Sequence, residues 1–292
     1  MSRCLVIAPG YGDLIRELGL LDPRRAPAFE RGRLVTNPGS SRVFEFRHPD
    51  EEGAPRYFFK VYRYYRPRRM VTFTYRPCVA RVEYEALVRL RKAGVPAAEP
   101  VAWGSHRILR VVRSCFILTR AVEGTRDLDV FLPDYFARPR TQEWVGYKRR
   151  GLETLAGMVR RMHAAGFFDG NLVFRNILVR EDADPSFWFI DHPKGRVIPA
   201  WRGAARRQAL IHDLASLGRQ APEWFSRTEC LRFFLQALGA PGLGEEEKRL
   251  FRSVVALRRH MLRKRDSKLK KVARRGKRPV RPWPAGDPSA RR

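Results

Sequence analysis

Cysteine is rare in this 292-residue sequence, and no two cysteines are spaced as a pair. The four are widely separated and form no CxxC motif: Cys4, Cys78, Cys115 and Cys230. This excludes a disulfide-stapled secreted domain, and the lack of cysteine ligands at zinc spacing from His163, His192 and His212 argues against a zinc site. A reducing compartment suits such a chain, so we expect a cytoplasmic protein.

Long apolar runs are also missing. No uninterrupted stretch approaches the roughly 18 residues that a membrane-spanning helix needs. The first residues carry a single Arg before Pro9 and Gly10 end the apolar stretch, which is unlike a secretory signal peptide. Glycine and proline follow no short-period repeat, which excludes collagen-like and solenoid folds. The chain does have 44% hydrophobic and 11% aromatic residues, enough for the core of one large domain or of two lobes.

Acidic residues are outnumbered by basic ones. The sequence has 30 Asp and Glu against 59 Lys and Arg, a formal net charge of +29. Residues 258–292 hold fifteen Lys or Arg and two Asp, a net charge of +13, so residues 1–257 contribute the other +16. The electrostatic field of so many positive charges attracts polyanions, whether nucleic acid, anionic lipid or phosphorylated glycolipid. Charge alone does not choose among them, and a basic nucleic-acid-binding protein stays an alternative.

The first half of the chain has the pattern of a small β-rich lobe. Residues 1–30 indicate an irregular lead-in with one short helical stretch. The following residues, 31–120, predict five strands around one helix: strands at 34–36, 42–46, 56–62, 107–112 and 115–119, and a helix at 79–93. Residues 63–77 are basic, aromatic and interrupted by two prolines, which predicts a loop or lid.

The second half is mostly helical. Residues 121–257 predict five helices, at 128–136, 144–165, 206–218, 228–238 and 245–265. Two short apolar runs lie between the second and third of them, at 167–180 and 187–191. Residues 258–292 predict a basic, disordered tail, because apolar residues become scarce there. The expected fold class is therefore α+β, with a β-rich N-terminal lobe and a larger helical C-terminal lobe.

Polar side chains cluster in the two short apolar runs: Asp169, Asn171, Asn176 and Asp191. A carboxylate and an amide at the ends of buried strands can converge on one cation. Mg²⁺ takes few protein oxygens and completes its shell with water and substrate phosphates. Lys60, at the end of an apolar strand in the other lobe, is placed to neutralise phosphate, and Glu83 or Glu85 on the next helix is placed to hold that lysine.

These residues lie in motifs that resemble the protein-kinase-like fold and, within it, the lipopolysaccharide kinase (Kdo/WaaP) family. The resemblance covers roughly residues 30–240, with its motifs in the family's order. The motifs read YFFKVY at 57–62, VEYEAL at 82–87 followed by AGVP at 93–96, MHAAGFFDGNLVFRNILV at 162–179, FID at 189–191, and HDLASL at 212–217 followed by FSRT at 225–228.

The resemblance implies a two-lobed phosphotransferase that uses Mg-ATP on a sugar hydroxyl of a lipopolysaccharide core. Lys60 would then hold the nucleotide phosphates and Glu83 would hold Lys60. Asn176 and Asp191 would bind the metal. The resemblance also implies a hinge near Thr119–Val122 whose backbone contacts adenine. Asp213 is expected to be structural and to bind the backbone of the catalytic loop. Lys194 and Arg196 either meet an anionic acceptor or are solvated loop charges.

One position departs from the kinase pattern. The catalytic-loop aspartate of kinases precedes the metal-binding asparagine by five positions, and that position here is Asn171. An amide cannot accept a proton as a carboxylate does. Either Asn171 orients the acceptor hydroxyl, or Asp169 reaches in from a shifted loop, or the chain is a pseudokinase scaffold that binds nucleotide without turnover. The basic tail would attach the protein to an anionic membrane surface at the inner membrane beside its glycolipid.

Overall fold

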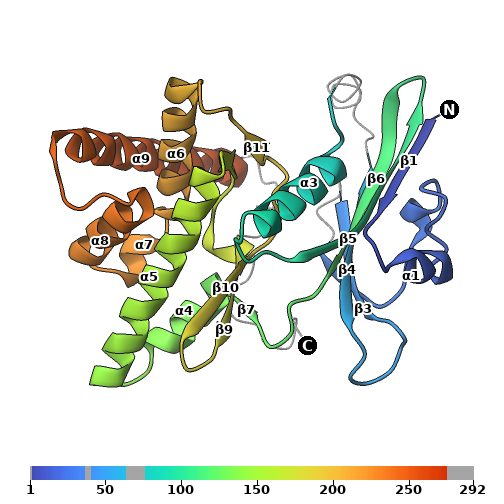
Figure 1. Cartoon of the computed structure of the whole chain (residues 1–292), viewed down its shortest axis with the longest axis horizontal. Helices are drawn as coiled ribbons and strands as arrows, with labels where there is room; N and C mark the ends of the chain where they lie inside the picture. Colours follow the sequence, from blue (N-terminus) through green and yellow to red (C-terminus); the bar gives the residue numbers. More distant parts are fainter. Residues whose placement is uncertain (1, 37–40, 64–75, 275–292) are drawn as a thin grey trace. The chain divides into compact units, whose positions relative to one another are not determined.

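The computed structural model describes residues 2–36, 41–63 and 76–274, which form two compact units (Figure 1). The sheet unit comprises Met1–Arg89, Ala97–Glu123 and Asp191–Lys194. The helical unit comprises Leu90–Pro96, Gly124–Ile190 and Gly195–Arg292. Most of the loop expected at 63–77 lies outside the described residues, and so does the tail beyond Arg274.

The sheet unit is built on a six-stranded antiparallel sheet with strand order β1-β5-β6-β4-β3-β2. Its strands are β1 (Ser2–Ile7), β2 (Arg33–Thr36), β3 (Ser41–Arg47), β4 (Arg56–Arg63), β5 (Glu99–Ile108) and β6 (Val111–Arg120). Its helical segments are α1 (Gly12–Glu17), the 3-10 turn η1 (Ala26–Ala28) and most of α3 (Val79–Lys92).

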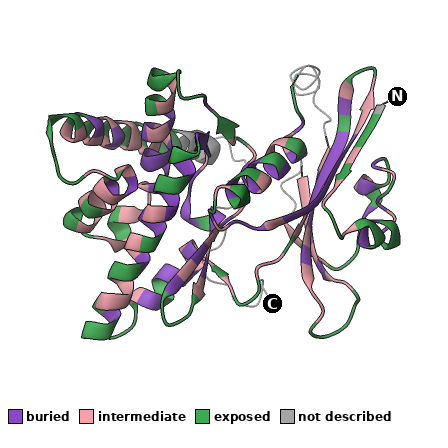
Figure 2. Ribbon diagram, in the orientation of Figure 1, coloured by how far each residue is buried: buried purple, intermediate pink, exposed green. Residues whose placement is uncertain are grey.

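Alternation along β4 decides which side chains enter the core of the sheet unit. Successive side chains of a strand point to opposite faces of the sheet. Tyr57, Phe59 and Val61 are buried, and they pack in one cluster with residues of β3, β6, α1 and η1. The intervening residues, including Lys60 and Tyr62, therefore point to the opposite face of the sheet. Strands β5 and β6 differ from β4, because most of their residues are buried in nearly continuous runs (Figure 2).

Two expectations for this unit were wrong. Residues 1–30 are no irregular lead-in, because β1 pairs with β5 from Ser2↔Arg107 to Ile7↔Ala102. The partner strand lies a hundred residues away, so no local pattern reveals it. The strand expected at 107–112 contains a hairpin turn, where Leu109 and Arg110 have φ values of 47° and 68°. Such turns usually carry Gly, Asn or Asp, and this one carries none of them.

In its described residues, which end at Arg274, the helical unit contains five α-helices of nine or more residues and a short one. They are α4 (Leu128–Phe136), α5 (Gln142–Ala164), α6 (Gly203–Leu217), α7 (Ala221–Trp224), α8 (Arg227–Leu238) and α9 (Glu245–Arg274). Helix α5 packs on α8, and α6 packs on α9 (Figure 1). Short strands complete the unit: β7 (Arg126–Asp127), β8 (Phe167–Phe168), β9 (Ile177–Glu181), β10 (Pro185–Phe189) and β11 (Arg196–Val197).

Local signals fix several helix ends in this unit. The Thr141 hydroxyl caps α5 by accepting the Trp144 N–H. Ser226 and Glu229 form a capping box at the start of α8. Gly239 ends α8 with a φ of 69°, a conformation that glycine adopts without strain.

Helix α9 is longer than the helix expected at 245–265 and runs to Arg274, so residues 266–274 of the basic tail are helical rather than disordered. Leu250 and Val254 are buried on this helix, and Met261 receives a long contact from the Ser216 hydroxyl on α6. Lys and Arg are good helix formers, so the helix continues where apolar residues become scarce. Among the described residues, no helix has both the length and the apolar character needed to span a membrane.

Candidate active site

Lys60 occupies the centre of the sheet unit's sheet, between Val43 on β3 and Ile117 on β6. Its Nζ lies 3.4 Å from Oε1 of Glu83, and it also donates to the Asp191 carboxylate. The Glu83 side chain is buried, whereas the Asp191 side chain is 36% exposed. Glu85 instead pairs with Arg81 in solvent at 2.7 Å. The lysine cluster, defined as Lys60, Glu83 and Asp191, therefore brings together three of the predicted residues.

Tyr62 joins this cluster, and sequence reasoning missed it. Its hydroxyl donates to Oε2 of Glu83 at 2.9 Å, and Lys60 Nζ lies 5.3 Å from the centre of its ring. Residues two apart on a strand share a face, so Tyr62 follows from Lys60 once β4 is recognised. The hydroxyl holds Oε2 of Glu83, while Lys60 Nζ lies at nearly equal distances, 3.4 and 3.5 Å, from the two oxygens of that carboxylate.

The charges in the lysine cluster do not balance. Burial would lower the pKa of Lys60, but the Glu83 and Asp191 carboxylates outweigh it and raise that pKa. Burial raises the pKa of Glu83, and Lys60 only partly offsets it. Burial acts the same way on Asp191, yet the Lys60 ammonium outweighs it and lowers the pKa of that carboxyl. With both carboxylates ionised, Lys60, Glu83 and Asp191 together carry a net charge of one negative unit. Asp191 is the more exposed of the two carboxylates.

The backbone at Asp191 is unusual. Its φ is 60°, in the left-handed region that few residues other than Gly, Asn and Asp adopt. It directly follows β10 and Ile190, whose N–H donates to the Asn176 carbonyl at 2.9 Å. Strained conformations of this kind persist where the surrounding structure holds them, often at functional sites. Here the conformation turns the carboxylate toward Lys60.

In the helical unit, Asp213 organises the backbone of residues 162–179, the segment that resembles the kinase catalytic loop and is called the catalytic loop below. It lies on α6 with a fully buried side chain and accepts the N–H groups of Asp169 at 2.9 Å and Gly170 at 2.8 Å. Nε2 of His163 lies 3.2 Å from the same carboxylate. Burial opposes its ionisation, but the hydrogen bonds from the histidines and the loop outweigh it and lower the pKa of Asp213 to about 2. The expected structural role of Asp213 agrees with this geometry.

The other predicted loop residues differ in exposure. Asp169 is fully buried, Asn176 is nearly so, and Asn171 is half-buried. The Asn176 amide nitrogen donates to the Asn171 carbonyl at 3.1 Å. Because the nitrogen side of the amide is used on the backbone, a cation at Asn176 would bind Oδ1. Of the two candidates for contact with an acceptor, Asn171 is the one with solvent access.

Two further expectations concern the edges of the site. Of the stretch Thr119–Val122, Thr119 lies at the end of β6 and the Ala121 N–H donates to the Arg56 carbonyl at 2.8 Å, so that donor is engaged within the sheet. Lys194 and Arg196 are both exposed. No group of three or more His, Cys, Asp or Glu side chains suited to a metal occurs in the described part of the chain.

Comparison with known proteins assigns the chain to a family. The model of the lipopolysaccharide kinase (Kdo/WaaP) family matches residues 53–234. The chain belongs to this family. The match contains the lysine cluster and the catalytic loop, and it agrees with the resemblance that the sequence motifs carry.

Curated relatives match over shorter stretches. The lipopolysaccharide core heptose(I) kinase WaaP of Pseudomonas aeruginosa is 38% identical over 87 residues, which are 30% of this chain and 31% of that protein. The WaaP of Escherichia coli is 36% identical over 84 residues, 29% of this chain and 31% of the relative. The 3-deoxy-D-manno-octulosonic acid kinase of Mannheimia succiniciproducens is 26% identical over 113 residues, 38% of this chain and 43% of that kinase. The matches thus span between 31% and 43% of the length of these relatives.

A solved structure matches far more of the chain. A WaaP structure described as being in complex with acyl carrier protein superposes with a TM-score of 0.63 at 25% identity. The match covers 90% of this chain and 98% of that one. The expected protein-kinase-like α+β fold, with a β-rich part and a larger helical part, is thereby confirmed.

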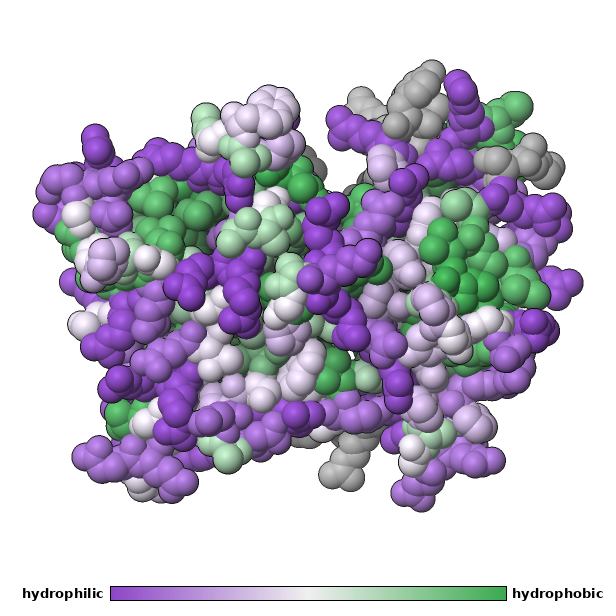
Figure 3. Space-filling view, viewed as in Figure 1, coloured by the Kyte–Doolittle hydropathy of each residue, from purple (hydrophilic) through white to green (hydrophobic). Residues whose placement is uncertain are grey.

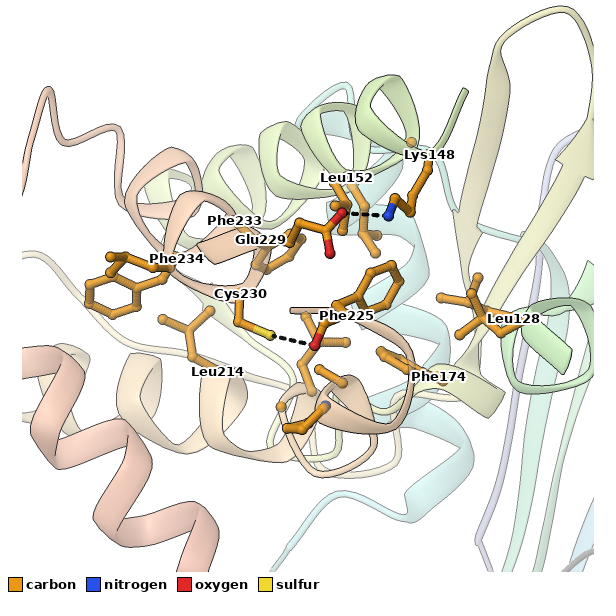
Figure 4. Close-up of a pocket in the computed structure, with 18 of the residues that line it drawn as sticks. Leu128, Lys148, Leu152, Phe174, Leu214, Phe225, Glu229, Cys230, Phe233 and Phe234 are labelled. Atoms are coloured by element: carbon orange, nitrogen blue, oxygen red, sulfur yellow. Dashed lines mark hydrogen bonds and ion pairs between the residues drawn. The ribbon is translucent and has the colours of Figure 1, made fainter. Parts of the chain in front are cut away.

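The helical unit also holds an apolar cavity that sequence reasoning missed. Its volume is about 690 Å³, and helices α4, α5, α6, α8 and α9 contribute to its wall (Figure 4). Lys148 and Glu229 form an ion pair at 2.6 Å on its wall, while Leu152, Phe225 and Phe234 are among its apolar lining residues. Apolar surface is visible between α8 and α9 in Figure 3. The wall combines residues from 128 to 259, so no local pattern reveals it.

Proposed function

We propose that this chain is an ATP-dependent kinase that phosphorylates a sugar hydroxyl of a lipopolysaccharide core. The observation that supports this most is the buried lysine cluster, in which Lys60 is held between the carboxylates of Glu83 and Asp191. Phosphoryl transfer depends mainly on positioning and on neutralising charge at the phosphates. A lysine fixed by two carboxylates keeps its charge and its position, which is what a nucleotide phosphate requires.

The resemblance also implies a magnesium ion bound by Asp191 of the lysine cluster and by Asn176, which lies outside that cluster. Asp191 offers a partly exposed carboxylate with a lowered pKa, and Asn176 offers an amide oxygen. Few protein oxygens are typical of Mg²⁺ sites, where water and phosphate oxygens supply the rest. The bound ion would neutralise charge that develops on the phosphates during transfer. Lys60 would then contact the nucleotide phosphates, and Glu83 with Tyr62 would keep Lys60 in place.

Nucleotide binding tests this assignment directly. Asp191→Asn should abolish the increase in ATP affinity that Mg²⁺ produces, measured by calorimetric titration with and without the metal. Asp182→Asn is a matched control, because Asp182 pairs with Arg180 at an exposed position of the helical unit. An Asp191→Asn variant that binds Mg-ATP as tightly as the parent would contradict the proposal that Asp191 binds the metal.

Acceptor activation rests on Asn171 or Asp169. Asn171 is the half-buried one, so we propose that it orients the acceptor hydroxyl, while Asp169 stays part of the buried frame held by Asp213. Asn171→Asp should then raise turnover or leave it unchanged, since general-base assistance gives about 10²- to 10⁴-fold where it operates. Nucleotide binding without phosphate transfer, in the parent and in Asn171→Asp alike, would favour a pseudokinase scaffold.

We also propose that the chain binds an acyl carrier protein. The similar solved structure has such a partner, and the cavity of about 690 Å³ with its apolar wall suits an acyl chain. Arg227, Arg258 and Arg259 contribute to the cavity wall and would meet acidic groups of the partner. Co-purification with palmitoyl-loaded carrier protein should fall at least tenfold in Cys230→Phe, which narrows the cavity, and remain unchanged in Leu243→Phe, which adds a ring at an exposed residue.

Membrane attachment is the third element of the proposal. Arg259, Arg263, Lys264 and Arg265 are exposed on α9, and each basic residue near an anionic bilayer contributes about 1 kcal/mol. The protein would therefore sit at the inner face of the membrane beside its glycolipid. Co-sedimentation with phosphatidylglycerol vesicles should decrease with salt and with the quadruple change of these four residues to Ser. Salt-sensitive RNA binding in the absence of vesicle binding would support the nucleic-acid alternative instead.

A further inference from the structure

One large aromatic side chain of the helical unit lies in solvent. Trp201 is 83% exposed, whereas Trp103 and Trp144 are buried and the other described tryptophans are partly buried. Exposed tryptophan forgoes the burial that usually stabilises this residue, and solvent-exposed Trp with Arg is enriched where proteins bind partners. The guanidinium carbon of Arg202 lies 5.8 Å from the centre of the Trp201 ring, which makes a stacked aromatic and cationic pair.

The backbone around Trp201 is anchored on both sides. Before it, the Ile198 N–H donates to the Gly166 carbonyl at 2.9 Å, and the Ile198 side chain packs with Phe168 and Ala209. After it, the Arg206 guanidinium donates to the His163 carbonyl at 2.7 Å. Between these anchors, the Arg202 N–H donates to the Pro199 carbonyl at 3.1 Å and closes a turn. The exposed indole is thus presented by a fixed turn, which lowers the entropic cost of binding a ligand.

The anchored segment runs beside the start of the catalytic loop. Strand β11 pairs with β8 in the register Arg196↔Phe168 and Val197↔Phe167. Phe168 is followed directly by Asp169, whose N–H is held by Asp213. Both Arg196 and Val197 are exposed. The turn that presents Trp201 is therefore built on the same strand pair that leads into the catalytic loop, all within the helical unit.

This combination has a definite chemistry. The face of an indole ring packs against the C–H face of a sugar ring, and an adjacent guanidinium pairs with a carboxylate or phosphate in bidentate geometry. Arg196 adds a second exposed cation on the same segment. We infer that Trp201 and Arg202 form a subsite for an acidic or phosphorylated sugar of the acceptor, an inference that rests on the proposed sugar-kinase function. Its place beside the catalytic loop favours an acceptor sugar over a lipid surface as the ligand.

Nuclear magnetic resonance of the full chain labelled with ¹⁵N-tryptophan tests the inference. The probe is a deacylated lipopolysaccharide core oligosaccharide that contains Kdo and phosphorylated heptose, titrated without nucleotide. The indole N–H signal that disappears in Trp201→Phe should shift on titration. The dissociation constant should rise at least tenfold in Trp201→Ala and in Arg202→Ala, and by less than about threefold in Trp201→Phe, which keeps an aromatic face.

Trp188→Phe is the matched control, because Trp188 also stacks with an arginine, Arg180 at 4.9 Å, but lies on β10 and is partly buried. It should leave the dissociation constant unchanged. The inference would be overturned if the oligosaccharide does not bind, or if it binds Trp201→Ala as tightly as the parent. It would also be overturned if the oligosaccharide leaves the Trp201 signal unchanged while phosphatidylglycerol vesicles shift it. Trp201-dependent binding without phosphate transfer would leave the subsite standing and count against the kinase activity alone.

Discussion

Each unit of this protein contains a buried helix carboxylate, and the two behave in opposite ways. Glu83 on α3 has a raised pKa, whereas Asp213 on α6 has a pKa lowered to about 2. Asp213 accepts two backbone N–H groups and faces His163, so its negative charge is fully compensated. Glu83 shares one ammonium group with a second carboxylate, Asp191, so its charge is not. The comparison separates a carboxylate whose charge is held by several hydrogen bonds from one that shares a single ammonium group with a second carboxylate.

The largest effect should follow removal of the compensated carboxylate. Asp213→Ala leaves the N–H groups of Asp169 and Gly170 buried without their acceptor, and we expect the free energy of unfolding to fall by about 3–5 kcal/mol. Urea denaturation followed by circular dichroism measures this. Asp184→Ala is a control, because Asp184 is an exposed partner of Arg150 and should change stability by less than about 0.5 kcal/mol. A small loss in Asp213→Ala would remove its structural role.

Replacing the shared ammonium should act on turnover more than on folding. Lys60→Met removes the charge that we propose contacts the nucleotide phosphates, and we expect kcat/KM for ATP to fall about 10²- to 10³-fold. The free energy of unfolding should fall by less than in Asp213→Ala, because Glu83 can take up a proton once Lys60 is gone. Steady-state kinetics and urea denaturation of one preparation give both values. A loss of stability as large as that of Asp213→Ala would contradict the contrast between the two carboxylates.

The pH dependence of stability should have opposite signs at the two carboxylates. With a folded pKa near 2 and an ordinary unfolded value, Asp213 contributes about 2 kcal/mol above pH 4, and this is lost as the pH falls toward 2. Glu83 has a raised folded pKa, so its contribution is fully present below its unfolded pKa and is lost as the pH rises through the folded value. Differences between the parent and Asp213→Asn or Glu83→Gln, measured by denaturation from pH 2 to 8, should therefore slope in opposite directions. Parallel slopes would count against the assignment.

The smallest effect is expected at Tyr62. Tyr62→Phe removes one hydrogen bond to Glu83 and keeps the ring beside Lys60, so stability should fall by about 1 kcal/mol. KM for ATP should rise a few-fold, because Glu83 holds Lys60 less firmly. The control is Tyr11→Phe, which removes a hydroxyl bonded to Glu99 at 2.7 Å elsewhere in the sheet unit and should leave KM unchanged. Equal KM changes in both variants would show that Tyr62 has no specific role.

The sequence predicted those site residues that lie in strands and helices with a clear local pattern of hydrophobic residues. A lysine inside an aromatic strand and an acidic pair on the next helix predicted that Glu83 or Glu85 holds Lys60, and the family resemblance favoured Glu83. The structure places the Lys60 and Glu83 side chains within 3.5 Å. Asp213 as a support of the loop backbone was likewise predicted from its motif. These residues lie in elements whose hydrophobic period shows directly in the chain.

What sequence reasoning missed depends on contacts between distant residues or on backbone shape. Strand β1 pairs with a strand a hundred residues away, and the β5–β6 turn uses Leu109 and Arg110 in place of glycine. The apolar cavity combines several helices, none of which has an unusual pattern alone. Sequence analysis did not single out Trp201, because the anchors that hold its turn, at Ile198 and Arg206, are contacts with residues 163 and 166.

The central claim is that Lys60, Glu83 and Asp191 of the lysine cluster act in phosphoryl transfer from ATP to a lipopolysaccharide sugar. Its most direct test is transfer of ³²P from γ-labelled Mg-ATP to a heptose- and Kdo-containing core acceptor by the full chain, beside Lys60→Met and Asp191→Asn. We predict labelled acceptor with the parent and a loss of at least 10²-fold with either variant. No labelled acceptor with the parent, or equal labelling by all three proteins, would contradict the claim.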